Sequence, residues 1–335
     1  MRGRGGPRGQ RGGRGGGRAP SGPWSRLKPV DLDPLEAIGL PSKGDNRLLD
    51  FKTQERYYTK IVERYMSFCS DAGERQELLR RFSSLQLSEP LHTTPKPPPS
   101  TSSTPADPSR PVPRHASSAP AVPAAASISA SADTQSLSDV LAALRKLREG
   151  IVASKRADDF AVQAYLFCIR LSVLVKHPES YHPAILHLLR RIQPRHPGGA
   201  AAALTSIEMT EVVGYLVLDT ACRRGDLAEA YALRSRYRLR DPKIDGVLDA
   251  LAHDNYVLYK RLRRSVDGHK AKLLEFGEGP MRQHTLKCFG RGYLGVELEF
   301  LEECADSTWM DLVTNDGVGW ELDGTKVVIR KIKAR

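Results

Sequence analysis

Residues 290–333, near the end of the chain, read GRGYLGVELEFLEECADSTWMDLVTNDGVGWELDGTKVVIRKIK and decide the fold. Apolar residues recur there at the spacing of one helix face and predict a short α-helix: Val296, Leu298, Leu301 and Cys304. Ser307 is then placed to cap a second short helix that carries Trp309 and Leu312. We expect Gly317 to end that helix, because glycine adopts the left-handed backbone conformation at little cost.

A two-stranded hairpin is predicted directly after this helix pair. Residues 320–322 and 327–329 are rich in β-formers and flank Asp323-Gly324, a dipeptide typical of two-residue hairpin turns. Two helices followed by a hairpin predict a winged helix. We expect both tryptophans to be buried beneath the hairpin, in a core made of Leu298, Leu301, Trp309, Leu312, Trp320, Val327 and Ile329.

Apolar stripes upstream predict a stack of α-helices. The stripe from Leu137 to Leu147 marks one amphipathic helix. Residues 158–175 are apolar on nearly every side, as in a helix at the centre of a core. Further helices are expected to start at His182-Pro183 and to span Ile207–Cys222.

Two polar residues are expected to cap later helices of this stack. Asp226 follows the turn at Arg224-Gly225, and Asn255 precedes a helix in which Tyr256 and Tyr259 should pack back on the stack. No strict period is visible, so the pattern favours a short irregular stack over a regular repeat array.

A helical run that ends in a short-winged module resembles the PCI superfamily, the scaffold modules of the proteasome lid, the signalosome and initiation factor three. The final GWELDGTKVVI is most similar to the short-winged branch, which includes the small lid and signalosome subunits, subunit k of the initiation factor and the Sac/GANP scaffolds of mRNA export. Asp254-Asn255-Tyr256 stands where that branch has a gly-asn-tyr type loop, although the glycine is missing. The resemblance implies an all-α, TPR-like helical stack over residues 134–335, with the winged helix at about 290–333.

The N-terminal part divides by composition. Residues 1–30 are an arginine- and glycine-rich tail, and residues 31–51 are a linker or a peptide that docks on a partner or on this chain's own body. Residues 52–87 predict a helical hairpin that caps the main domain or presents a face to another protein. Residues 88–133 are rich in proline, serine and alanine and predict a disordered linker.

The formal net charge of +12 points to a polyanionic partner. Glycine keeps the tail unfolded while its arginines can clamp phosphates or stack on bases: Arg2, Arg4, Arg8, Arg11, Arg14 and Arg18. Such tails bind RNA with little sequence preference, and the alternative is a flexible extension with methylation sites or a nuclear-import signal. A basic ridge near the winged helix offers a second RNA contact, or a solvated charged face: Lys260, Arg261, Arg263, Arg264, Arg330, Lys331 and Lys333.

Sequence-specific DNA binding is not expected, because the expected recognition helix, STWMDLVTND, has no basic side chain to reach base edges. Catalysis is not expected either. The glycine-rich stretches lack the strand and the Lys-Ser/Thr of a phosphate-binding loop, and His182 and His187 have no cysteine nearby for a zinc site. Cys168 and Cys222 lie in the most apolar helices, where burial makes a thiol a poor nucleophile. We therefore expect no metal and no cofactor.

The five cysteines are widely spaced, and neither a signal peptide nor an apolar run long enough to cross a membrane is visible. These features predict a reduced, intracellular protein without membrane partners. By resemblance to the Sac/GANP group, we expect a noncatalytic adaptor in mRNA processing or export that binds protein complex subunits and RNA. We expect it in the nucleus, with the cytoplasm as a second location. The alternative is a structural subunit of a proteasome-lid, signalosome or initiation-factor type complex.

Overall fold

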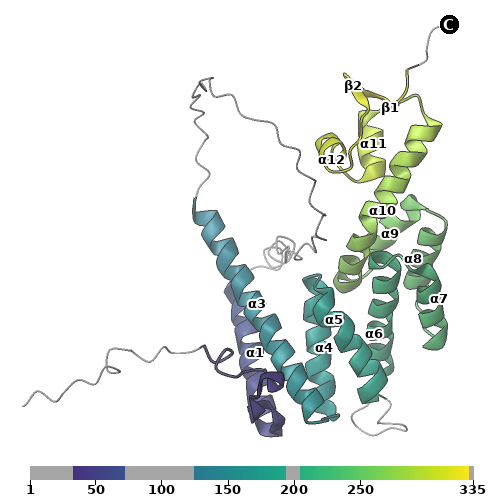
Figure 1. Ribbon diagram of the computed structural model, residues 1–335. Coiled ribbons are helices and arrows are strands. Elements are labelled where there is room, and N and C mark those ends of the chain that lie inside the picture. Colours follow the sequence, from purple (N-terminus) through teal and green to yellow (C-terminus); the bar gives the residue numbers. More distant parts are fainter. Residues whose placement is uncertain (1–32, 72–123, 194–203, 332–335) are drawn as a thin grey trace, which may run out of the picture.

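The computed structural model describes residues 33–71, 124–193 and 204–331. Figure 1 shows that these residues form a row of helices that leads into a small C-terminal module with a β-sheet. The arginine-rich tail, the second half of the expected 52–87 hairpin, most of the expected linker and Lys333 lie outside the described residues.

The elements follow one another along the chain as short 3-10 turns, helices and three strands. In order they are η1 (Pro41–Lys43), η2 (Asn46–Leu49), α1 (Phe51–Asp71), α3 (Ala124–Ala153), α4 (Asp159–Leu174), α5 (Pro178–His187), η3 (Leu188–Ile192), α6 (Ser206–Leu218), η5 (Asp219–Arg223), α7 (Leu227–Arg236), α8 (Pro242–Ala252), α9 (Tyr256–Ser265), α10 (Gly268–Gly292), β1 (Gly295–Glu297), α11 (Leu298–Ala305), α12 (Trp309–Thr314), β2 (Glu321–Asp323) and β3 (Lys326–Val328). The η3 and η5 segments are π-helical continuations of the helices before them.

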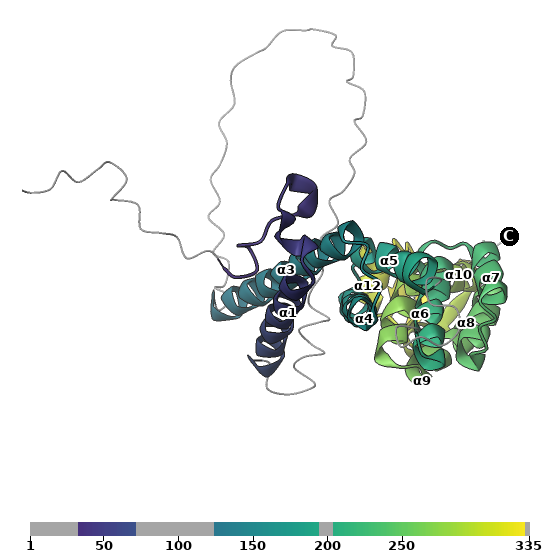
Figure 2. The same ribbon diagram turned by 90° about the horizontal axis from the view of Figure 1, so that it is seen from below.

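α1 and α3 form a two-helix arm at one end of the row (Figures 1 and 2). α3 begins at Ala124, inside the region expected to be linker up to residue 133; alanine is the best helix former, and this stretch is alanine-rich. The predicted stripe Leu137–Leu147 is buried against the neighbouring helices. From α1, Tyr57 and Ile61 enter the same core, so the described half of the expected hairpin packs on the main stack.

Residues 33–50, which we call the strap, lie across α1 and α3. Leu35 and Leu48 of the strap are buried in the main core. The backbone oxygen of Leu35 accepts hydrogen bonds from the Tyr57 hydroxyl at 2.8 Å and from Lys146 Nζ at 3.0 Å. Of the two alternatives for residues 31–51, linker or docking peptide, the described part therefore docks on the chain's own body.

The middle of the stack is built from the pairs α4–α5, α6–α7 and α8–α9, with α10 packed against α4, α6 and α9. The expected central helix is confirmed, since α4 is buried along most of its length. The predicted start of α5 at His182-Pro183 is wrong: Pro178 occupies the first turn, where its missing N–H costs nothing, and Pro183 lies inside the helix. Asp226 and Asn255 cap α7 and α9 as predicted. None of the described helices combines the length and apolar character needed to cross a bilayer.

A buried carboxylate joins α5 to the π-helical turn after α6. Asp219 is fully buried and accepts hydrogen bonds from the Tyr181 hydroxyl at 2.5 Å and from Arg223 Nε at 2.6 Å, with His182 Nδ1 at 3.2 Å. Burial raises the pKa of Asp219, but the hydrogen bonds from Arg223, His182 and Tyr181 outweigh it and hold the pKa well below its usual value. The two histidines considered for zinc are thus used in packing, since His187 stacks on the ring of Tyr165.

The C-terminal module, residues 295–331, follows α10 in the order β1, α11, α12, β2, β3. Its antiparallel sheet has the strand order β1-β3-β2, with Val296 and Leu322 both opposite Val327. The expectation that Val296 begins a helix is wrong. Val296 lies in β1, an unexpected third strand that pairs with β3, and the helix α11 begins only at Leu298.

Two turn assignments in the module also differ from the sequence prediction. Thr308, not Ser307, caps α12, and its hydroxyl accepts from the Asp311 N–H. The hairpin loop is Gly324-Thr325, not Asp323-Gly324, because Asp323 pairs with Lys326 and Gly324 takes the positive φ of 63°.

The module has a small core of its own, to which α10 contributes Leu286 and Phe289. The residues expected to form it all belong to this cluster: Leu298, Leu301, Trp309, Leu312, Trp320, Val327 and Ile329. The expectation that Trp309 and Trp320 are buried beneath the hairpin is met only in part, since both pack against this cluster and are half-buried. Three short strands cannot cover two indole rings.

The strap can be tested by a glycine that faces it. A Cβ added at Gly150 of α3 would lie 2.7 Å from the Cβ and the backbone oxygen of Leu48, so Gly150→Ala should destabilise the protein by about 1–3 kcal/mol through overpacking. Gly290→Ala in α10 is the matched control, because its Cβ would make only ordinary contact with Trp320, and alanine favours a helix by about 0.5–1 kcal/mol. Urea unfolding measures both. Equal effects of the two substitutions would contradict the docked strap.

The Asp219 cluster predicts a specific acid sensitivity. Because the folded pKa of Asp219 is lowered, its contribution to stability is complete above the unfolded pKa of about 4 and is lost as the pH falls below it. Asp219→Asn should cost roughly 3 kcal/mol at pH 7, by leaving Arg223 without its counter-charge. The variant should also lose less stability than the parent between pH 5 and pH 3 in urea titrations. Parallel pH profiles would exclude Asp219 as the source.

Candidate nucleic-acid interface

α9 carries four of the expected RNA-contacting cations and lies between the stack and the C-terminal module. Asn255 starts this helix by accepting the Leu258 N–H at 3.0 Å. Tyr259 anchors it, because its buried hydroxyl donates to the Leu274 oxygen of α10 at 2.6 Å. The ring lies over Gly277, where any side chain would collide with it. The orientation of α9 about its own axis is therefore set.

Lys260 and Arg263 point toward the C-terminal module. Lys260 Nζ lies 2.9 Å from Asp306 Oδ1 and donates to the Glu303 backbone oxygen at 2.5 Å. Arg263 Nε lies 2.5 Å from Glu278 Oε1, and its Nη1 lies 3.4 Å from Asp306 Oδ2. These two members of the expected ridge are held in ion pairs that join α9, α10 and the turn after α11.

The charges of this junction shift the pKa values of its carboxylates in opposite directions. Burial raises the pKa of Asp306, but the hydrogen bond from Lys260 and the nearby arginine charges lower it below the usual value. Burial raises the pKa of Glu278, and the charge of Arg263 compensates only in part. Asp306 also has a left-handed backbone, with φ of 52°, where α11 ends. The junction thus depends on one aspartate at a constrained position.

Arg261 and Arg264, which neighbour Lys260 on the surface of α9, are exposed to solvent. Neither lies within ion-pair distance of a carboxylate of the described residues. Both line a groove of about 430 Å³ with Val257 and Lys260 of α9 and with Phe300 and Glu303 of α11. The Phe300 side chain is 45% exposed. An arginine pair beside an exposed aromatic ring suits a phosphodiester backbone with an unstacked base.

Phe300 is not among the site residues predicted from the sequence, although its position off the apolar stripe is visible there. It lies off the apolar stripe of α11, whose Leu301 and Ala305 are buried. Its ring meets Phe289 of α10 edge to face, with the centroids 5.9 Å apart. The stripe accounts for the helix without Phe300, so an aromatic residue outside it was available for a surface role.

Arg330 and Lys331, the described C-terminal cations of the expected ridge, do not line this groove. Arg330 donates through Nη2 to the Arg291 backbone oxygen at 2.6 Å, and Lys331 pairs with Glu321 of β2 at 2.6 Å. Lys333 and the tail arginines lie outside the described residues. Of the cations expected to form the basic ridge, the described structure therefore brings together only the four on α9. Two of these four, Lys260 and Arg263, are held by carboxylates.

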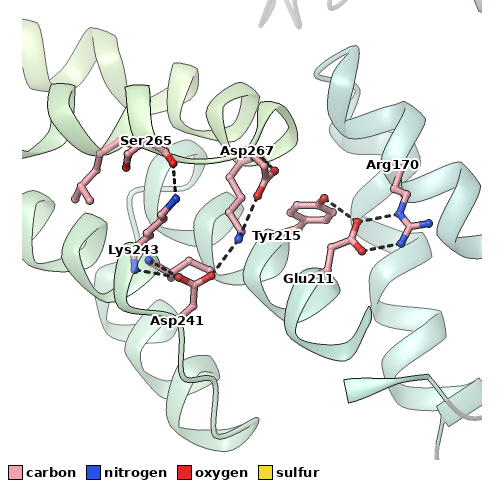
Figure 3. Close-up of polar contacts among 10 residues, drawn as sticks. Arg170, Glu211, Tyr215, Asp241, Lys243, Ser265 and Asp267 are labelled. Atoms are coloured by element: carbon pink, nitrogen blue, oxygen red, sulfur yellow. Dashed lines mark hydrogen bonds and ion pairs between the residues drawn. The ribbon is translucent and has the colours of Figure 1, made fainter. Parts of the chain in front are cut away.

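Much of the remaining positive charge is used inside the stack. Figure 3 shows a polar cluster where the starts of α8 and α10 meet α4 and α6. Lys270 Nζ lies 3.0 Å from Asp241 and 3.2 Å from Asp267. Arg170 pairs with Glu211 through two bonds of 2.9 and 2.7 Å. Lys270 and Arg170 are therefore held by carboxylates within the stack.

α12, at the place of the recognition helix in a winged helix, has no cationic side chain and exposes Met310 and Val313. Its geometry therefore offers bases no charged donor. Burial raises the pKa of the Cys168 thiol, and raises that of Cys222 to about 12, so neither is activated as a nucleophile. Within the described ranges, no group of His, Cys, Asp and Glu side chains is arranged to hold a metal ion.

Comparison with family models and with curated proteins found no match for this chain.

The junction can be separated from the groove by substituting Asp306. Asn tolerates the left-handed backbone, so Asp306→Asn removes the charge and leaves the turn intact. We expect faster hydrogen exchange in residues 295–331 and a global loss of only about 0.5–1 kcal/mol, because the ion pairs are partly exposed. Glu299→Gln, an exposed change on α11, serves as the control. Uniform acceleration over the whole stack would show that the module does not depend on these pairs.

Proposed function

We propose that this protein is a noncatalytic scaffold of the PCI type, whose C-terminal module is a winged helix and which binds RNA and protein partners. The order helix, strand, helix, helix, strand, strand from α10 to β3 supports the winged-helix interpretation. The stack of paired helices before it supports the PCI interpretation. The setting we propose is mRNA processing or export, in the nucleus.

The observation that carries RNA binding is the difference in ion pairing among the four cations of α9. Lys260 and Arg263 are neutralised at the junction, and this leaves Arg261 and Arg264 directed to solvent beside Phe300. Contacts to phosphate and to the face of a base hold a single strand, such as RNA, without reading its sequence. The acidic and apolar surface of α12 agrees with such nonspecific contact.

The tail and the groove would contribute separately to affinity. The arginines of residues 1–18 would add electrostatic contacts, each of which releases counterions from the RNA. The groove would hold the strand against the folded body. Protein partners would then be recruited by other surfaces of the stack.

Binding of the full chain to a uridine oligomer, measured by anisotropy at several salt concentrations, tests this proposal. Replacing Arg261 and Arg264 together by Gln should weaken binding about tenfold and reduce the slope of log K against log salt by about 1.4, as expected for two lost phosphate contacts on a single strand. Removing residues 1–18 should reduce the slope further.

The matched control replaces Arg56 and Lys60, two exposed cations of α1, by Gln. An equal loss in this control would mean diffuse charge attraction instead of a site. If all binding leaves with residues 1–18 and the double variant binds like the parent, the groove has no part in RNA binding.

A further inference from the structure

A second large groove lies far along the chain from the module. It has a volume of about 880 Å³ and lies between the strap, α3 and α5. α3 lines it with residues spaced along one helix face, including Arg145, Arg148 and Val152. The strap contributes Leu49 to the lining, and α5 contributes Pro183.

One side of this groove is aliphatic. Leu49 and Val152 are 38% and 50% exposed, whereas the adjacent Leu48 and Ile151 are fully buried. Two aliphatic side chains from distant parts of the sequence thus face the same hollow. Burying such a pair against an aliphatic partner removes apolar surface from water, which favours binding. Aliphatic side chains offer no flat face for a base, so this wall favours peptide over RNA.

The groove also offers a hydrogen-bond donor beside the aliphatic side chains. Arg148 donates through Nη1 to the Ser180 backbone oxygen at 3.1 Å, while its Nε is buried without an acceptor. A buried donor without an acceptor is costly, and a carboxylate would satisfy it. Glu149, which lines the same groove, accepts from Arg145 at 3.3 Å and from Ser42 at 3.0 Å and makes no hydrogen bond with Arg148.

A second hollow of about 280 Å³ continues the groove, since both are lined by Val152 and His187. It adds Arg191, which pairs with no carboxylate of the described residues. The aliphatic wall is therefore bordered by Arg148 and Arg191. The exposed Glu179 at the start of α5 is a carboxylate at the far rim.

The strap shows how this body holds an acidic, leucine-bearing segment. Leu35 is buried on α1 and α3, and the neighbouring Asp33 carboxylate pairs with Arg64. The empty groove beside the strap presents the same two kinds of contact, aliphatic and arginine.

We propose that the groove between the strap, α3 and α5 binds a short segment of a partner protein that carries leucine-type side chains next to acidic ones. The apolar side chains lie against Leu49 and Val152, and a carboxylate accepts from Arg148. The inference rests on the scaffold function proposed above and assigns that scaffold one protein-binding site, separate from the α9 groove.

The test uses the full chain and three labelled peptides of about 12 residues, a length common for groove-bound segments. They repeat Glu-Glu-Leu-Leu, Lys-Lys-Leu-Leu and Glu-Glu-Ser-Ser, and binding is measured by anisotropy. Only the first should bind. Val152→Glu, at an exposed position, should weaken its binding at least about tenfold, and Arg148→Gln several-fold. Val257→Glu in the α9 groove is the matched control and should leave peptide binding unchanged.

Several results would overturn the proposal. They are no binding of the first peptide, equal binding of the lysine peptide, or an unchanged affinity in Val152→Glu with an unchanged melting temperature. Binding that appears only after deletion of residues 74–87 would show that this chain's own segment occupies the groove. Loss of uridine-oligomer binding in Val152→Glu would make the groove an RNA site. If the experiment on Arg261 and Arg264 shows that the α9 groove does not bind RNA, the peptide result is unaffected. The two proposals can therefore fail separately.

Discussion

The contact between Tyr259 and Gly277 is the constraint on which the rest of the C-terminal half depends. The ring fits against α10 only because residue 277 has no side chain, and its hydroxyl is satisfied by the Leu274 oxygen. This contact sets which side of α9 faces the module and which faces water. The helix therefore delivers two cations to a junction and two to a surface, although all four are close in sequence.

α10 connects the helical stack to the C-terminal module. Its first half packs in the stack and its second half supplies Leu286 and Phe289 to the core of the module. The stack and the module are thus joined by a continuous helix and by the charged junction at Asp306. A surface that spans both, such as the groove of Arg261 and Phe300, keeps its shape because both supports are rigid.

At the N-terminal end of the row, the strap packs on the two helices α1 and α3 and shares their core. It buries Leu35 and Leu48 but leaves Leu49 at the edge of the large groove. Arg156 also holds this end together. It is nearly buried, lies over the rings of Phe51 and Phe160, and pairs with the carboxylates of Glu55 and Asp158. The two proposed surfaces therefore lie at different ends of one helical row, as suits a protein that brings unlike partners together.

Periodicity and caps determined much of this protein from sequence alone. The central burial of α4, the caps at Asp226 and Asn255 and the apolar set of the module are local properties, set by spacing and by side chains that bond their own backbone. The third strand, the docking of the strap and the sorting of the α9 cations were decided only by the tertiary structure. Each depends on a partner far away in sequence, such as Val327 for Val296 or Asp306 for Lys260. No local pattern encodes the distance between two such residues, because it is the packing of the helices between them that sets it.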